Sequence, residues 1–276
     1  MDDQLTSVHN PLVVKFRRAL RDARFRDKHG IVVVEGFRLV RDAFLSGWLP
    51  AEVIYTAAFA TRPEGRAFLD ELRRGVRSPR LFRVSDQVFQ SISEEAHPQG
   101  IMAVGPQPHA KPESIWPAPA GSGYGPFLVA LAGVQDPGNL GTIVRVADAA
   151  GVSGILVTRG TADPWAPKAV RAAMGSTFHV PVVLGEEPGS EMRALQAAGV
   201  VCLGTSARGH IDYRKADYRR PVAIWLGNEG NGLSAELLAL CDDVVSVPIY
   251  GRAESLNVST AAAVVLYEAA SQREGS

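Results

Sequence analysis

The stretch that says most about the fold of this 276-residue chain is Asp136-Pro-Gly-Asn-Leu-Gly-Thr-Ile-Val-Arg145-Val-Ala-Asp-Ala-Ala-Gly151. Two later segments complete it, Leu226-Gly-Asn-Glu-Gly-Asn-Gly-Leu-Ser234 and Val247-Pro-Ile-Tyr-Gly-Arg-Ala-Glu-Ser-Leu-Asn-Val-Ser-Thr260. The first segment predicts a helix that begins after a Pro-Gly pair, the second a glycine-rich loop after a strand, and the third a loop that leads into a helix. Each segment alone is a modest signal, whereas three in this order are highly specific.

Together the three segments resemble the three motifs of the SpoU/TrmH family of RNA ribose 2′-O-methyltransferases, within the SPOUT superfamily. The resemblance covers the C-terminal half of the chain. It implies a SPOUT α/β domain at residues 125–276 with a parallel sheet, a deep trefoil knot that holds S-adenosyl-L-methionine, and a homodimer formed through this domain. Periodicity alone predicts less: strands, among them 154–157 and 222–226, alternate with helices along this half, which indicates a parallel sheet with helices on both faces.

The composition is that of an ordinary globular protein, with 46% hydrophobic and 21% charged residues. Two cysteines, no signal-like N-terminal segment and no apolar run of about 20 residues predict a cytoplasmic protein without a membrane span. The net charge of zero does not indicate a nucleic-acid partner. Two local basic clusters, at residues 15–28 and 73–83, could contact phosphates, although solvated helix faces explain either cluster as well.

The N-terminal half is expected to form a small α/β domain at residues 1–108, joined by a linker at 109–124 that is rich in Pro, Gly, Ser and Ala. Its segments Val34-Glu-Gly36 and Pro98-Gln-Gly-Ile101 resemble the ribosomal-protein-L30e-like substrate-binding domain that accompanies this methyltransferase family. The expected helices are a basic amphipathic one at 11–27, one at 37–46, and one that ends near residue 75 after a capping box at Thr61 and Glu64. The expected strands are at 31–35, 52–55, 81–84 and 100–104. The expected RNA contacts are Lys15, Arg17, Arg18, Arg21 and Arg171.

Arg145 is the candidate catalytic cation. It stands in a helix that is apolar on nearly every face, where an arginine is costly unless it is paired or functional. The alternative is that Arg145 snorkels to solvent or pairs with Asp148 one turn along. The resemblance places Arg145 at the ribose 2′-hydroxyl. Because a guanidinium stays protonated at neutral pH, we expect it to anchor phosphate and lower the pKa of the hydroxyl electrostatically, not to act as a base.

The remaining site residues come from the resemblance, and each has a plainer structural interpretation. Asn139 is expected to cap its helix and also to shape the catalytic pocket. Glu229 is a turn residue or helix-terminal carboxylate that the resemblance places in the active site. Ser255 and Asn257 are candidate helix caps that become active-site residues by the same resemblance. The implied cofactor contacts are Thr205, Leu226, Gly227, Val247, Ile249 and Leu256.

Other chemistries have no support in the sequence. Six scattered histidines show no metal-ligand spacing, so no metal is expected. There is no G-x-S-x-G elbow, and no G-x-G-x-x-G follows a strand, which disfavours acyl transfer and a nucleotide-dependent oxidoreductase. The resemblance of the three motifs implies S-adenosylmethionine-dependent 2′-O-methylation of a ribose in RNA, and the resemblance of the N-terminal domain makes 23S ribosomal RNA the preferred substrate. The alternatives are a tRNA ribose 2′-O-methyltransferase and a non-catalytic RNA-binding or ribosome assembly factor.

Overall fold

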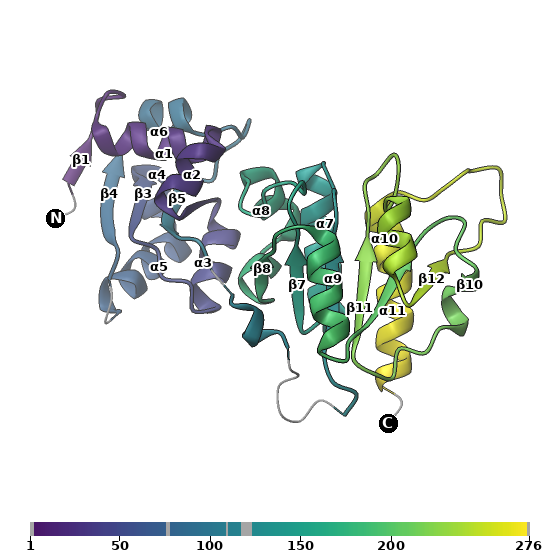
Figure 1. Ribbon diagram of the computed structural model, residues 1–276. Coiled ribbons are helices and arrows are strands. Elements are labelled where there is room, and N and C mark those ends of the chain that lie inside the picture. Colours follow the sequence, from purple (N-terminus) through teal and green to yellow (C-terminus); the bar gives the residue numbers. More distant parts are fainter. Residues whose placement is uncertain (1–2, 76–77, 109, 117–122, 275–276) are drawn as a thin grey trace. The chain divides into compact units, whose positions relative to one another are not determined.

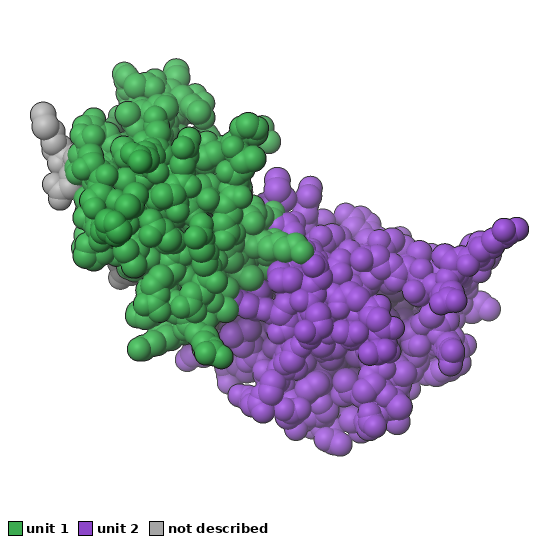
Figure 2. Space-filling model, turned by 90° about the horizontal axis from the view of Figure 1, so that it is seen from above, with its two compact units in different colours: residues 1–108, 165–171 green, residues 109–164, 172–276 purple. Residues whose placement is uncertain are grey.

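The computed structural model describes residues 3–75, 78–108, 110–116 and 123–274 (Figure 1). Its contacts divide the chain into two compact units, residues 1–108 with 165–171 and residues 109–164 with 172–276 (Figure 2). These are called the N-terminal and C-terminal units. Residues 109 and 117–122 of the expected linker lie outside the described residues, and its residues Pro112–Ser114 form the short 3-10 helix η1. Each unit has its own sheet and its own core.

The N-terminal unit is a five-stranded mixed sheet with helices, in the order β1-β4-β3-β5-β2. β1, β4 and β3 run parallel to one another, whereas β5 is antiparallel to both β3 and β2. The strands are β1 (Asp3–Leu5), β2 (Ile31–Glu35), β3 (Glu52–Thr56), β4 (Arg80–Val84) and β5 (Ile101–Pro106). The helices are α1 (Pro11–Arg21), α2 (Ala23–His29), α3 (Phe37–Leu45), α4 (Ala57–Thr61), α5 (Pro63–Arg74) and α6 (Asp86–Ile92).

The helix expected at residues 11–27 is divided into α1 and α2. Asp22 leaves the helical conformation, and its side chain accepts a hydrogen bond from the Phe25 amide as the N-cap of α2. The capping box expected at Thr61 and Glu64 is wrong, because the Thr61 hydroxyl donates to the Ala58 carbonyl within α4. α5 begins instead with Pro63 at its first position and has no side-chain cap. The short elements β1, α4 and α6 were not predicted.

The apolar face of α1 packs against the sheet and forms part of the core of the N-terminal unit. Val13, Phe16 and Leu20 stand at helical spacing and are buried against sheet residues that include Ile54 and Met102. The basic residues of α1 therefore occupy the opposite, partly exposed face.

The C-terminal unit has a seven-stranded sheet in which every neighbouring pair is parallel, which confirms the predicted α/β class. The strand order is β10-β12-β9-β11-β6-β7-β8. The strands are β6 (Phe127–Leu131), β7 (Gly154–Val157), β8 (Val182–Leu184), β9 (Val201–Thr205), β10 (Ile211–Asp212), β11 (Val222–Leu226) and β12 (Asp243–Ser246). The trefoil knot that the resemblance implies stays a prediction.

Helices flank this sheet. The α-helices of this unit are α7 (Pro137–Ala149), α9 (Pro188–Ala197), α10 (Ala235–Leu240) and α11 (Val258–Glu274), and its 3-10 helices are η2 (Ser176–Phe178) and η3 (Tyr213–Lys215). Most of α8 (Pro167–Ala173) belongs to the N-terminal unit. Leu128, Ala130 and Trp225 form one cluster with Met192 and Leu195 of α9 and the partly buried leucines of α10. The alternate strand residues are also buried, which leaves the opposite face to α7 and α11, two helices that contact each other along their length.

The order of the strands in space brings the carboxyl ends of four strands together, where a ligand can bind. β6, β9, β11 and β12 follow one another in the chain with β7, β8 and β10 between them, yet they are adjacent in the order β12-β9-β11-β6. Their carboxyl ends therefore meet, with Leu226 opposite Leu131 and Thr205 opposite Val245. Loops that leave the carboxyl ends of parallel strands form the usual ligand crevice of open α/β sheets. Within the described ranges, no helix is both long and apolar enough to span a bilayer.

Candidate active site

A chain of side-chain hydrogen bonds joins the three sequence motifs at this edge of the sheet. The Asn139 amide Nδ2 donates to Glu229 Oε1 over 3.1 Å, and Asn257 Nδ2 donates to Asn139 Oδ1 over 3.1 Å. These residues are 90 and 118 positions apart in the sequence. Because Asn139 donates from its nitrogen and accepts at its oxygen, its two neighbours fix the orientation of the amide. The structure thus brings together Asn139, Glu229 and Asn257, one from each motif.

Glu229 holds the start of α7. Its carboxylate accepts from the backbone N–H of Gln135 (3.0 Å) and of Asp136 (2.9 Å), besides the Asn139 amide. Partial desolvation alone would raise the pKa of Glu229, but these hydrogen bonds outweigh it and lower the pKa below its ordinary value. Glu229 is therefore ionised at neutral pH, and both of its oxygens are engaged.

The cap of α7 is Asp136 and not Asn139, which corrects the expectation from the sequence. The Asp136 side chain accepts from the Asn139 backbone N–H over 3.0 Å, with Pro137 in the first helical turn. The Asn139 side chain is not needed as a cap and is free to link Glu229 and Asn257. Sequence analysis missed Asp136, although an Asp-Pro pair before an apolar helix is a standard start signal.

Arg145 is exposed on the outer face of α7. The expectation that this helix is buried on nearly every face is wrong, because Leu140, Ile143 and Ala147 form one inner face while Thr142 and Arg145 face out. The alternative pairing with Asp148 does not occur either, since Asp148 Oδ2 lies 2.8 Å from His179 Nδ1. Arg145 makes no hydrogen bond or ion pair with any residue that the structure describes. Its charge is available to a bound ligand.

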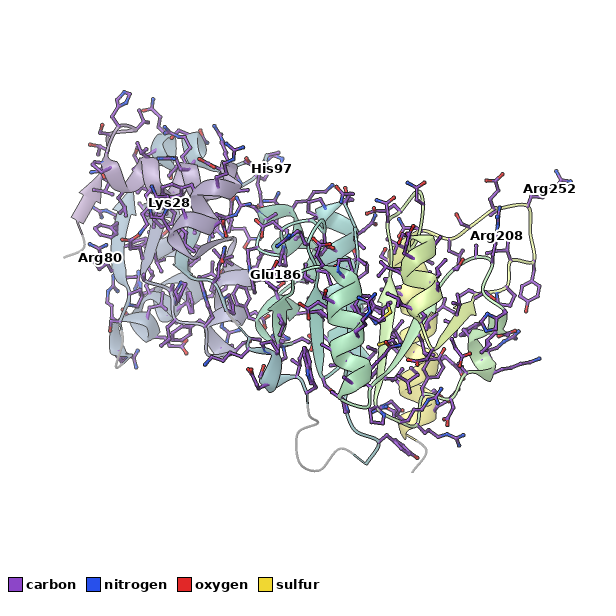
Figure 3. The ribbon with its side chains drawn as sticks, in the orientation of Figure 1. Lys28, Arg80, His97, Glu186, Arg208 and Arg252 are labelled. Carbon is purple, nitrogen blue, oxygen red and sulfur yellow. The ribbon has the colours of Figure 1, made fainter. Side chains whose placement is uncertain are left out.

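The third motif forms an open loop before α11. Residues 250–257 are exposed, and Arg252 projects from the loop into solvent (Figure 3). Residues 248–256 form no backbone hydrogen bond with the described part of the chain, and the Ser255 hydroxyl likewise has no partner there. Asn257 ends the loop, with its Oδ1 accepting from the backbone N–H (2.8 Å) and hydroxyl (2.6 Å) of Ser259. Unpaired backbone groups beside a strand edge are available to a polar ligand.

The glycine-rich loop is closed on itself. A methyl group on Gly227 would collide with the backbone of Gly232 and Leu233, and Asn228 and Gly232 exchange both of their backbone hydrogen bonds. Asn228, which sequence analysis also missed, fixes the loop further: its Nδ2 donates to Gly133 O and its Oδ1 accepts from Gly230 N. Gly227 is required by this close backbone approach whether or not it touches a ligand.

The expected cofactor contacts gather around the same strand ends. Leu226 is fully buried at the end of β11, and its carbonyl accepts from the Ala132 amide. The Thr205 hydroxyl donates to the Trp225 carbonyl over 2.9 Å, so this side chain joins β9 to β11. Val247 and Ile249 are half-buried after β12, and Leu256 is 37% exposed. An apolar lining beside unpaired backbone groups suits a ligand with an aromatic base and polar edges.

The sequence profile of the SpoU rRNA Methylase family matches residues 126–267, which contain all of these residues. The chain belongs to this family. The profile of the MRM3-like substrate binding domain matches residues 10–103, within the N-terminal unit of this SpoU methylase.

Several relatives align with nearly the whole of this SpoU methylase. The 23S rRNA (guanosine(2553)-2′-O)-methyltransferase RlmP of Bacillus subtilis is 34% identical over 96% of this chain and 98% of its own. The structure of an AdoMet-bound rRNA methyltransferase from Sinorhizobium meliloti is 34% identical, covers 97% of both chains and superposes with a TM-score of 0.85. The SpoU methyltransferase AviRb from Streptomyces viridochromogenes, in complex with AdoMet, is 32% identical over 97% of this chain and 99% of its own, with a TM-score of 0.84.

Four of the five basic residues expected to contact RNA have partners within the N-terminal unit of the SpoU methylase. Lys15 pairs with the buried Glu52 over 2.6 Å, and Arg17 donates to the Val8 carbonyl and the Ser91 hydroxyl. Arg18 and Arg21, which are more exposed, lie within 3.3 Å of Asp22 and 3.7 Å of Glu94 respectively. Arg171 is half-buried on α8, with its Nη1 shielded from solvent and without a hydrogen-bond partner among the described residues. The exposed pairs can be exchanged for phosphate contacts at little cost.

Among its described residues, the SpoU methylase has no group of three or more His, Cys, Asp or Glu side chains that could hold a metal ion.

Proposed function

We propose that this chain transfers the methyl group of S-adenosyl-L-methionine to the 2′-hydroxyl of a ribose in ribosomal RNA, with 23S rRNA as the substrate. The observation that carries the proposal is the hydrogen-bonded series Glu229–Asn139–Asn257, which joins the three motifs of a SpoU methylase at the carboxyl edge of a parallel sheet. Similar proteins support the choice of cofactor and substrate, because two have AdoMet-bound structures and one is named a 23S rRNA methyltransferase.

The residues present fit this cofactor. The adenine ring suits the apolar side chains of Ile249 and Leu256, and its polar edge suits the unpaired backbone groups of residues 248–256. The sulfonium of S-adenosylmethionine supplies a methyl group that is already activated. The protein must therefore hold the ribose oxygen in line with that methyl group and assist the loss of the hydroxyl proton.

Arg145 is the proposed catalytic residue. Its guanidinium is exposed and has no partner among the described residues, so it can bind the phosphate next to the target ribose or the hydroxyl oxygen itself. A positive charge at this oxygen stabilises the alkoxide that forms as its proton passes to a water molecule, so Arg145 does not have to act as a base. The Ser255 hydroxyl, also unpaired and exposed, is the proposed second contact to the ribose.

Glu229 is proposed as a positioning residue and not as the base. Its lowered pKa and its three hydrogen bonds leave the carboxylate a weak proton acceptor. The same bonds fix the start of α7, the helix that presents Arg145.

We also propose that two copies of the chain pair through α7 and α11. The two helices pack against each other, and α11 leaves Tyr267 55% exposed beside the half-buried Val264 on its outer side. An exposed aromatic on an apolar helix suits a second copy of the same surface. Tyr267→Glu should convert a dimer into a monomer in light scattering after size-exclusion chromatography. A wild-type chain that elutes as a monomer at micromolar concentration would refute the pairing.

The test of function is methyl transfer from labelled S-adenosylmethionine to separated 23S rRNA, 16S rRNA and tRNA from cells that lack this gene. Label in 23S rRNA that resists alkaline hydrolysis supports ribose methylation, because a 2′-O-methyl group blocks the attack that cleaves the chain. Arg145→Ala should lower the rate by about 100-fold, the scale of a lost electrostatic contact in the transition state. Arg193→Ala, an exposed arginine on α9, is the matched control.

The outcomes separate the alternatives. Label in tRNA alone would show that the substrate is tRNA and not 23S rRNA. Cofactor binding in calorimetry without label in any RNA, including precursor ribosomal particles, would favour a non-catalytic assembly factor.

A further inference from the structure

The N-terminal unit contains a surface cavity of about 360 Å³ that lies away from the three methyltransferase motifs in the sequence. Its floor is buried and consists of Thr56 at the end of β3, Phe89 on α6 and Gly100 directly before β5. Gly100 has φ +81°, and a methyl group there would strike the Thr56 hydroxyl. The floor is therefore fixed by a position that only glycine fills without strain.

The rim of this cavity is polar and largely unpaired. Five exposed polar side chains line it: Arg62, Asp86, Gln90, His97 and Gln99. The first four have no hydrogen bond or ion pair with any residue in the described ranges. His97 projects from the surface of the unit (Figure 3). Four unpaired polar side chains around a hollow are more than a solvated helix face requires.

The amide of Gln99 has a fixed direction. Its Oε1 accepts from the backbone N–H of Phe37 over 2.7 Å. Because only an oxygen can accept that bond, the Nε2 group must face away from Phe37, and it remains a donor without a partner among the described residues. Asp86 offers the opposite chemistry, since an ionised carboxylate only accepts hydrogen bonds. Gln90 stands one helical turn from Asp86 on α6, so the two side chains share one face of that helix.

We propose that this cavity binds one unstacked guanine nucleotide of the RNA substrate. Guanine presents one acceptor, O6, beside two donors, N1–H and the N2 amino group, and this order complements the Gln99 donor and the two oxygens of Asp86. Neither adenine, cytosine nor uracil presents two adjacent donors to a carboxylate. Arg62 supplies a cation for the phosphate, and His97 supplies a ring on which the base can stack. A cavity of this volume lies within the range of small-ligand sites.

The carboxylate argues against a general phosphate-binding patch. An acidic side chain beside the cavity repels the RNA backbone, whereas it can accept hydrogen bonds from a base edge. The inference rests on the proposed function for its ligand class, RNA, but it assigns specificity to the N-terminal unit independently of the methyl-transfer chemistry.

The test uses the full-length chain and four fluorescein-labelled RNA pentamers of uridines whose central nucleotide is G, A, C or U. Fluorescence anisotropy at low salt should give a Kd at least about tenfold lower for the G pentamer, the discrimination of one bidentate base contact. Asp86→Asn should remove this preference, because its amide cannot accept from both donors. Asp27→Asn is the matched control, since Asp27 is an exposed residue of α2 outside the cavity.

A second measurement locates the bound base without relying on a variant. A pentamer with central 6-thioguanosine, irradiated on the wild-type chain, should crosslink to peptides that contain residues 86–100, as identified by mass spectrometry. Equal affinities for the four pentamers, or crosslinks confined to other segments, would overturn the proposal even if methyl transfer to 23S rRNA is observed. A guanine preference that depends on Asp86, in a chain that transfers no methyl group, would uphold it while the proposed function fails.

Discussion

Replacement of Glu229 by alanine should destabilise the C-terminal unit and slow methyl transfer. The change removes the three hydrogen bonds from the Gln135 and Asp136 amides and the Asn139 side chain. Bonds to a charged acceptor contribute up to about 3 kcal/mol each when buried, but Glu229 is exposed, and solvent screening reduces each to about 0.7 kcal/mol. We expect a loss of about 2 kcal/mol in the free energy of unfolding, which lowers Tm by about 4–8 °C for a unit of this size.

The effect should depend on pH with a defined sign. The folded-state pKa of Glu229 lies below its ordinary value of 4.5, so its charge stabilises the fold above that pH. The contribution is lost as pH falls through the lower folded-state pKa, and the difference between wild type and Glu229→Ala should shrink over the same interval. Urea unfolding followed by circular dichroism at pH 7 and near pH 3 measures both free energies.

Two further variants separate the charge from the side chain. Glu229→Gln keeps one acceptor oxygen and should lose about half as much stability. Glu254→Gln changes an exposed carboxylate without a hydrogen-bond partner in the described chain and should leave Tm unchanged. A Glu229→Ala protein with the wild-type Tm at pH 7, or with the same deficit at both pH values, would refute the assignment of Glu229 as the ionised link between the second motif and α7.

Three other outcomes are expected. Gly227→Ala should abolish S-adenosylhomocysteine binding in calorimetry and lower Tm, because the methyl group strikes the Gly232 backbone; full binding would show that the loop can open freely. Asn257→Ala should reduce kcat at least about tenfold with Tm lowered by only a few degrees, as it removes the bond to Asn139 and the two exposed bonds from Ser259; an unchanged kcat would contradict its role. Burial raises the pKa of Cys202 to about 12 and of Cys241 to about 11, so iodoacetamide at pH 8 should label neither thiol until urea unfolds the chain, and rapid labelling would disprove their burial.

Local sequence determined most of the strands and helices of this protein. Gly154–Val157 and Val222–Leu226 are apolar β-branched runs between turn signals, and both are strands at the predicted bounds. The apolar spacing of Val13 and Phe16 likewise predicted which face of α1 is buried. The break between α1 and α2 was not predicted. Asp22 ends α1 and begins α2 because its side chain accepts a hydrogen bond from the Phe25 amide, and apolar periodicity does not reveal such a bond.

The sequence by itself determined the three motifs, and through them the family and the identity of the candidate site residues. Only the tertiary structure decided what these residues do to one another. It shows that Asp136 caps α7, that Asn139 is thereby free to link Glu229 with Asn257, and that Arg145 is exposed without a partner in the described chain. The reason is physical: a hydrogen bond between residues about 100 positions apart depends on which strands lie side by side, and the order β12-β9-β11-β6 is set by packing of the whole sheet.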